Sequence, residues 1–227
     1  MRQHIVICGH SRAGTTLLHE VMRQQLSGAG WHFYDEERTF EAADQAHRKV
    51  VTKRPLDVFK HEQLKRYASG VDLRVILCIR DPRAMLTSYH QSVPNDYFYH
   101  AEHQYRVSKH DARLVNPGLL PVHHALMAIH ADPDIRSEIA RYEDTLGRSY
   151  RPGSTPAGMA RALNGDREID RSRLDAWRDH WPRLVDQFTR YPELFCVMQE
   201  YGYSLENFEG VGGIPPAPKQ FKGGGGC

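Results

Sequence analysis

The pattern of apolar positions predicts strands that alternate with helices along the chain. Residues 5–8 (IVIC) and 73–79 (LRVILCI) form apolar runs rich in β-branched residues, which are typical of strands buried on both faces of a sheet. Three shorter runs also read as strands: 31–34, 50–52 and 139–145. Strands that alternate with helical segments predict an α/β fold, in which helices cover both faces of a mostly parallel sheet.

Apolar residues at helical spacing predict where the helices lie. The expected helices cover 15–26, 39–49, 84–90 and 154–164. A longer amphipathic pattern runs over 172–202, where Pro182 and Pro192 should break or kink the helix. Its aromatic stripe of Trp177, Trp181 and Phe188 is interpreted as core rather than as a binding surface.

The length of the chain favours one domain over two. A chain of 227 residues can bury one sizeable α/β core, and we expect a single domain over 1–210. A Pro/Gly-rich tail should follow over 211–227, and its final GGGGC is typical of an artificial addition. The first strand begins within a few residues of Met1, which leaves no room for a signal peptide and predicts a cytoplasmic location.

Composition limits the classes of partner that the chain is expected to bind. The net charge is +2 with neutral histidines, so the chain has no broad electrostatic footprint for nucleic acid. No run approaches the roughly 18 apolar residues that a membrane-spanning helix needs. Any binding of anions must therefore be local, and the oligomeric state leaves no signal in the sequence.

The first strand leads through a glycine-bounded turn, GHSRAG, into the first helix. Such a turn can cradle a phosphate, because glycines let the backbone wrap around an anion while amides and the helix N-terminus supply positive partial charge. In the ATP-binding pattern G-x-x-x-x-G-K-[ST] a lysine follows the second glycine, whereas here Thr15 does. Arg12 is the only strong cation of the turn. These residues favour a smaller or differently placed anion than a triphosphate, with an ordinary βα turn as the alternative.

Residues 12–18, RAGTTLL, resemble the 5′-phosphosulfate loop of sulfotransferases that use 3′-phosphoadenosine 5′-phosphosulfate. That family reads [KR]-[ST]-G-T-T followed by apolar residues, and Ala13 stands where Ser or Thr is usual. The resemblance implies a P-loop-type three-layer sandwich. It also implies that one loop holds the donor, formed by Ser11, Arg12, Ala13, Gly14, Thr15, Thr16 and Leu17.

Two later stretches resemble the same family in the same order. Arg80 stands at a strand end and Ser88 in the next helix, an Arg-x7-Ser spacing similar to the family's 3′-phosphate site. Tyr142 is similar to a family tyrosine that packs near the adenine. The alternative interpretation of Arg80 and Ser88 is that the arginine has a structural role and the serine lies on a helix surface. The resemblance implies a donor that becomes 3′-phosphoadenosine 5′-phosphate, no metal, and a small-molecule or glycan acceptor with a hydroxyl or amine.

Sulfuryl transfer requires charge stabilisation and removal of a proton from the acceptor. Arg12 is suited to stabilise the leaving phosphate. Lys53, at a strand tip, could reach the sulfonate; the alternative is that Lys53 is a solvated lysine at the end of a strand. One branch of the family places its catalytic base in a K-[ST]-H-x-P motif, but here the stretch is TKRP, without histidine. The carbohydrate-acting branch has a glutamate two to three dozen residues beyond the loop. We therefore predict Glu37 as the base, followed by Glu36, with further alternatives at Glu41, His32, His10 and Lys53.

These candidates fall at the carboxyl ends of predicted strands. The loop, Glu36–Glu37, Lys53–Arg54 and Arg80 should therefore meet at one edge of the sheet, where ligands bind in such folds. Two other functions stay open. A P-loop nucleotide kinase-like phosphotransferase would use Thr15 or Thr16 for Mg²⁺ but lacks the lysine, and a nucleotide-binding module would bind without turnover.

Overall fold

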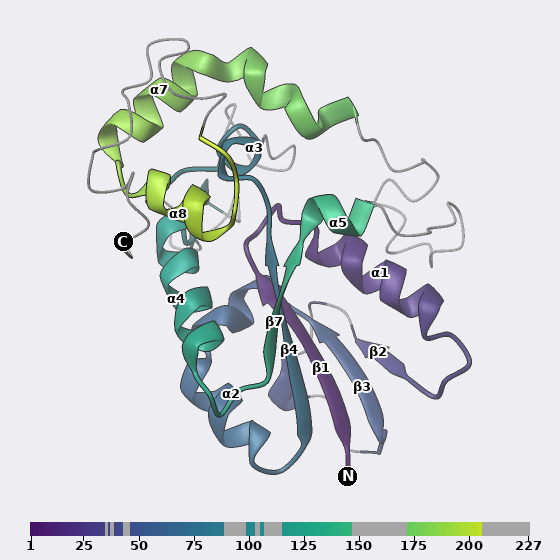
Figure 1. The fold of residues 1–227 in the computed structure, drawn as a ribbon. Coiled ribbons are helices and arrows are strands. Elements are labelled where there is room, and N and C mark those ends of the chain that lie inside the picture. Colours follow the sequence, from purple (N-terminus) through teal and green to yellow (C-terminus); the bar gives the residue numbers. More distant parts are fainter. Residues whose placement is uncertain are drawn as a thin grey trace. The chain divides into compact units, whose positions relative to one another are not determined.

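The computed structural model describes residues 1–34, 36, 39–42, 46–88, 99–102, 105–106, 115–146 and 172–205 (Figure 1). Its contacts divide the chain into two compact units. The first comprises 1–79 and 124–171, and the second comprises 80–123 and 172–227. A single domain over 1–210 stays a prediction, and the tail over 211–227 lies outside the described residues.

A five-stranded sheet forms the centre of the first unit, in the order β2-β3-β1-β4-β7 (Figure 1). The strands are β1 (Gln3–Gly9), β2 (His32–Tyr34), β3 (Lys49–Lys53), β4 (Asp72–Ile79) and β7 (Ser137–Arg141). Every neighbouring pair is parallel. The predicted α/β fold with a parallel sheet is confirmed.

Helices cover both faces of this sheet, as the alternation of side chains along β1 shows. His4 lies 2.9 Å from the Tyr67 hydroxyl of α2 (His61–Ala68), with the distance taken to Nδ1. The next residue, Ile5, lines a cavity with Leu18 of α1 (Thr15–Gln25). Because successive side chains of a strand point to opposite faces, α1 and α2 lie on opposite sides of the sheet. The three-layer arrangement follows.

Shorter elements complete the two units. The first unit also contains η1 (Phe40–Ala42), η2 (Pro55–Phe59) and α5 (Tyr142–Leu146). The second unit contains α3 (Pro82–Leu86), β5 (Tyr105–Arg106), β6 (Val115–Asn116), η3 (Ser172–His180), α7 (Trp181–Arg190) and α8 (Leu194–Glu200). Helix α4 (Leu119–Ala131) has residues in both. No helix of the described ranges is long and apolar enough to cross a membrane.

Arg183 of α7 connects three segments of the second unit. Its guanidinium donates to the carbonyl oxygens of Leu86 and Tyr99, each at 2.6 Å. Trp177 is buried beside the Arg83 guanidinium, 4.2 Å from the ring centre, and Phe188 is fully buried. The interpretation of Trp177 and Phe188 as core residues is confirmed.

Several predicted boundaries change in the structure. The helix expected over 39–49 is wrong in its described parts, because Phe40–Ala42 makes only a 3₁₀ turn and Lys49 already begins β3. The strand expected over 139–145 ends at Arg141, where α5 begins. Pro182 stands in the first turn of α7, and Pro192 lies in the gap before α8, so the long pattern is broken as expected. The helix expected over 154–164 lies outside the described residues.

Candidate phosphate-binding site

The loop after β1 begins at a position that only glycine can occupy. Gly9 has a φ of +123°, and a Cβ atom there would lie 2.5 Å from the Cys78 carbonyl oxygen of the neighbouring strand. The next amide, that of His10, donates to this same oxygen at 3.1 Å. A side chain at position 9 would therefore force β1 and β4 apart where the loop begins.

The middle of the loop holds two more residues in the left-handed region. Arg12 has a φ of +70° and an exposed side chain, and Gly14 has a φ of +76° where it caps α1. A non-glycine residue in this conformation is uncommon and costs of order 1–3 kcal/mol, so the surrounding structure must hold it. Ala13 between them is buried, while Ser11 and Leu17 are half-buried.

The N-terminus of α1 offers unused hydrogen-bond donors. The first amide of this helix to be satisfied is that of Leu18, which donates to the Gly14 carbonyl oxygen at 2.9 Å. The amides of Gly14, Thr15, Thr16 and Leu17 donate to none of the residues that the structure describes. The first turn carries no acidic side chain. These amides and the helix dipole therefore attract an anion without competition from a carboxylate of that turn.

A cation from another strand reaches this turn. Lys53, the last residue of β3, is 5% exposed, and its ammonium donates to the Thr16 hydroxyl at 3.1 Å. It also donates to Glu36 Oε1 at 2.7 Å. Both contacts use only two of the three N–H bonds of an ammonium group. The third has no acceptor among the described residues and is available to an anion.

Glu36 neutralises the buried lysine from the solvent side. The Glu36 side chain is 55% exposed, whereas that of Lys53 is 6% exposed. A buried ammonium group needs a charged or polar partner, because burial without one costs several kcal/mol. The pair thus keeps a cation beside the loop and a carboxylate within reach of a molecule that enters from solvent.

Tyr142 approaches the loop from the end of β7. It is the first residue of α5, and its ring lies so close to Gly14 that a Cβ atom there would be 2.3 Å from Tyr142 Cδ2. The ring therefore supports the loop directly. Packing of Tyr142 on an adenine stays a prediction.

The structure brings together only part of the predicted site. The loop, Thr16, Lys53 and Glu36 meet in the first unit. Arg80 directly follows β4, and Ser88 lies two residues beyond α3; both belong to the second unit, so their sharing of a ligand with the loop stays a prediction. Glu37 lies outside the described residues.

The alternative bases have other surroundings. Glu41 pairs with the Lys60 ammonium at 2.6 Å. The His32 ring stacks on that of His47, with 3.9 Å between ring centres. His10 is fully buried. Of the glutamates proposed as base, Glu36 is the one that the structure describes beside Lys53.

Sequence reasoning missed two features of this region. The bond between Lys53 and Thr16 depends on β3 lying beside β1, where Lys53 pairs in register with Ile7. The second feature is Asp57 of η2, which is fully buried with Lys60 as its nearest cation, at 3.9 Å. Burial raises the pKa of Asp57, although Lys60 and Arg54 oppose the shift. A lone aspartate after a Lys-Arg-Pro sequence carries no signal of burial.

No protein-family model matches the chain, and no curated protein is detectably similar to it. In the described part of the chain, no group of three or more His, Cys, Asp and Glu side chains is arranged to hold a metal ion.

Proposed function

We propose that this protein is a sulfotransferase that moves a sulfuryl group from 3′-phosphoadenosine 5′-phosphosulfate to a hydroxyl or amine acceptor. The observation that carries the proposal is the position of Lys53, a buried cation bonded to Thr16 in the first turn of α1. The cation enters from β3 rather than from the loop. Its free N–H bond suits a group attached beyond the phosphate that the loop amides hold.

Each residue then has a defined task. The amides of 14–17 and Arg12 stabilise the charge that develops on the leaving 5′-phosphate. Lys53 stabilises the sulfuryl oxygens, and Glu36 accepts the acceptor's proton. In the reaction one S–O or S–N bond forms to the acceptor while the bond from sulfur to the phosphate oxygen breaks, and that oxygen keeps the electron pair. Arg80, Ser88 and Tyr142 would hold the adenosine 3′-phosphate and the base.

The proposal includes the partners and the location of the protein. The acceptor is a small molecule or a glycan, and no metal takes part. The reaction takes place in the cytoplasm. A nucleotide kinase-like phosphotransferase fits these residues less well, because no lysine follows Gly14 in the loop.

Transfer from the sulfated donor tests the proposal. The protein is incubated with donor and a panel of phenols, sugars and amines, and the products are read by mass spectrometry, with Lys53→Met as the control. A gain of about 80 daltons, the mass of a sulfuryl group, should appear with wild-type protein in the presence of a chelator. Phosphorylation from ATP with a strict Mg²⁺ requirement would favour the kinase. Binding of the bisphosphate product without any turnover would favour a silent module.

A further inference from the structure

A cavity lies under α1, on the sheet face opposite to α2. Its volume is about 280 Å³, and all of its ten lining residues belong to the first unit. Protein interiors rarely leave voids much larger than a water molecule, whereas small-molecule sites begin at about 300 Å³. The cavity is therefore close to the lower size limit of small-molecule sites and much larger than a packing void.

One end of this cavity lies far from the loop. On β1 it reaches Ile5, and on β4 it reaches Arg74 and Ile76. Ile5 stands four residues before Gly9, and a strand rises about 3.3 Å per residue, so the Ile5 end of the cavity lies about 13 Å from the loop end of β1. The other end is nearer the loop, because Ala140 and Gly9 both pair with Cys78. An anion held by the loop amides would not reach the end at Ile5 and Arg74, which pair with each other in the sheet.

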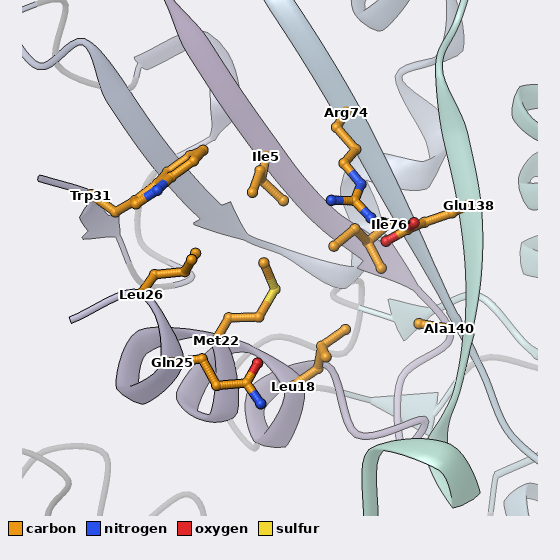
Figure 2. Close-up of a pocket in the computed structure, with 10 residues that line it drawn as sticks. All are labelled: Ile5, Leu18, Met22, Gln25, Leu26, Trp31, Arg74, Ile76, Glu138 and Ala140. Atoms are coloured by element: carbon orange, nitrogen blue, oxygen red, sulfur yellow. Dashed lines mark hydrogen bonds and ion pairs between the residues drawn. The ribbon is translucent and has the colours of Figure 1, made fainter. Parts of the chain in front are cut away.

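The lining combines an apolar interior with polar groups at its ends. The apolar part comes from α1 and the sheet, and includes Leu18, Met22, Ile76 and Ala140. Figure 2 shows the Trp31 indole on one side of the cavity and the pair of Arg74 and Glu138 on the other. Large apolar walls with a few convergent polar groups are typical of sites for small organic molecules.

The polar groups have bonding capacity to spare. Arg74 Nη2 donates to Glu138 Oε2 at 2.5 Å, and the other N–H bonds of Arg74 reach no acceptor in the described chain. Within those same ranges the Gln25 amide and the Trp31 indole N–H also make no hydrogen bond. The Arg74 and Glu138 side chains are each 43% exposed, so both can meet a ligand without being buried first.

The opposite charges of Arg74 and Glu138 cancel at this end of the cavity, and this favours an uncharged ligand. A carboxylate ligand would meet Glu138 beside its partner Arg74, and an ammonium ligand would meet Arg74 beside Glu138, so like charges oppose either ion. An uncharged group that both donates and accepts can bond to the carboxylate and to the guanidinium at once. We propose that this cavity binds an uncharged, planar amphipathic molecule, with its apolar ring between α1 and the sheet and an amide-like group at Arg74 and Glu138.

An isosteric series of probes tests the proposal. Benzamide, benzoate and benzamidine share one ring and differ in the charge of the attached group. The protein carries three tryptophans, so 5-fluorotryptophan labelling gives a ¹⁹F spectrum in which Trp31→Phe assigns the Trp31 signal. Benzamide should shift the Trp31 signal saturably with a dissociation constant of about 1 mM, as expected for so small a ligand. Benzoate and benzamidine should bind at least about tenfold more weakly, and Trp177 and Trp181 should not respond.

Variants distinguish a built site from a void. Glu138→Gln leaves Arg74 without its carboxylate partner and should make benzoate the preferred probe, while Arg74→Gln should favour benzamidine. Ala140→Leu fills the cavity and should abolish the benzamide shift without lowering the melting temperature. A shift that survives Ala140→Leu, no saturable shift of Trp31 with benzamide, or a probe order unchanged in both charge variants would overturn the proposal.

Discussion

The aromatic ring of Tyr142 lies against Gly14, where the loop after β1 enters α1. Gly14 therefore meets two requirements at once. Its φ of +76° disfavours any side chain, and the ring occupies the space that a Cβ atom would need. The end of β7 thus determines the shape of a loop that lies more than a hundred residues earlier in the sequence.

We predict that Gly14→Ala destabilises the protein more than Gly28→Ala does. Gly28 has a nearly equal φ of +79°, but a Cβ atom there would meet nothing within 4 Å. Gly28→Ala should therefore lower the free energy of unfolding by about 1–2 kcal/mol through backbone strain alone. Gly14→Ala should lower it by about 1–3 kcal/mol more because of overpacking. Urea unfolding measures both values.

A double-mutant cycle isolates the contact with the ring. In a Tyr142→Ala background, the cost of Gly14→Ala should fall to that of Gly28→Ala, since the ring no longer opposes the methyl group. An unchanged cost in that background would show that the ring does not restrict position 14.

Lys53→Met should reduce sulfuryl transfer at least about 100-fold, because a preorganised cation at the developing charge is lost. Stability should change little, since the Glu36 partner is more than half exposed and solvent can hydrate it. Lys60→Met is the matched control. Its ammonium also pairs with a glutamate, Glu41, at 2.6 Å, but it makes no contact with Thr16. Equal losses of activity in the two variants would remove Lys53 from the reaction.

Substitution of Glu36 and of Glu37 shows which of the two glutamates is the catalytic base. If Glu36 accepts the proton of the acceptor, Glu36→Gln should lower turnover by roughly 10²–10⁴ while binding of the bisphosphate product barely changes. Glu37→Gln should then retain most of the turnover. The opposite ranking would restore Glu37, the first prediction from the sequence. Near-normal turnover in both variants would turn attention to His32 and His10.

Arg80→Ala should weaken binding of the 3′,5′-bisphosphate much more than binding of the nucleotide that lacks the 3′-phosphate. A charged hydrogen bond contributes roughly 1.5–3 kcal/mol, and Ser88→Ala should cost less. Arg136→Ala, at a side chain that is 72% exposed, serves as the control for a lost surface charge. Isothermal titration with both nucleotides measures the difference. If binding of the two nucleotides is weakened equally, Arg80 has a structural role.

Local patterns predict the first strand of this chain and the loop after it, but they do not predict which distant residues become neighbours. The apolar run and the two glycines identify β1 and the loop, because a buried strand and a positive φ leave direct marks on residue choice. The bond between Lys53 and Thr16 depends on strand order, which one sequence does not encode locally. The helix expected over 39–49 failed because helical spacing alone does not show that Lys49 pairs with β1.

Stability should depend on pH through His4, which is fully buried between the two layers that α2 and the sheet form. Burial, and to a smaller extent Arg2, lowers the pKa of His4 to about 3, from 6.5 in the unfolded chain. Its two ring nitrogens contact the Tyr67 and Thr52 hydroxyls, each at 2.9 Å, which suits a neutral ring. Above pH 6.5 neither state binds the proton.

Between pH 6.5 and pH 3, only the unfolded chain binds a proton at His4, so stability should fall as the pH falls. The expected slope is at most about 1.4 kcal/mol per pH unit. Urea unfolding at pH 7 and pH 5 measures it, above the range in which most carboxylates titrate. His4→Gln keeps polar contacts but cannot take up a proton, so its loss between the two pH values should be smaller by about 1–2 kcal/mol. His130→Gln, at an exposed position of α4, should lose as much as the wild-type protein does, and an equal loss in His4→Gln would rule out His4 as the source.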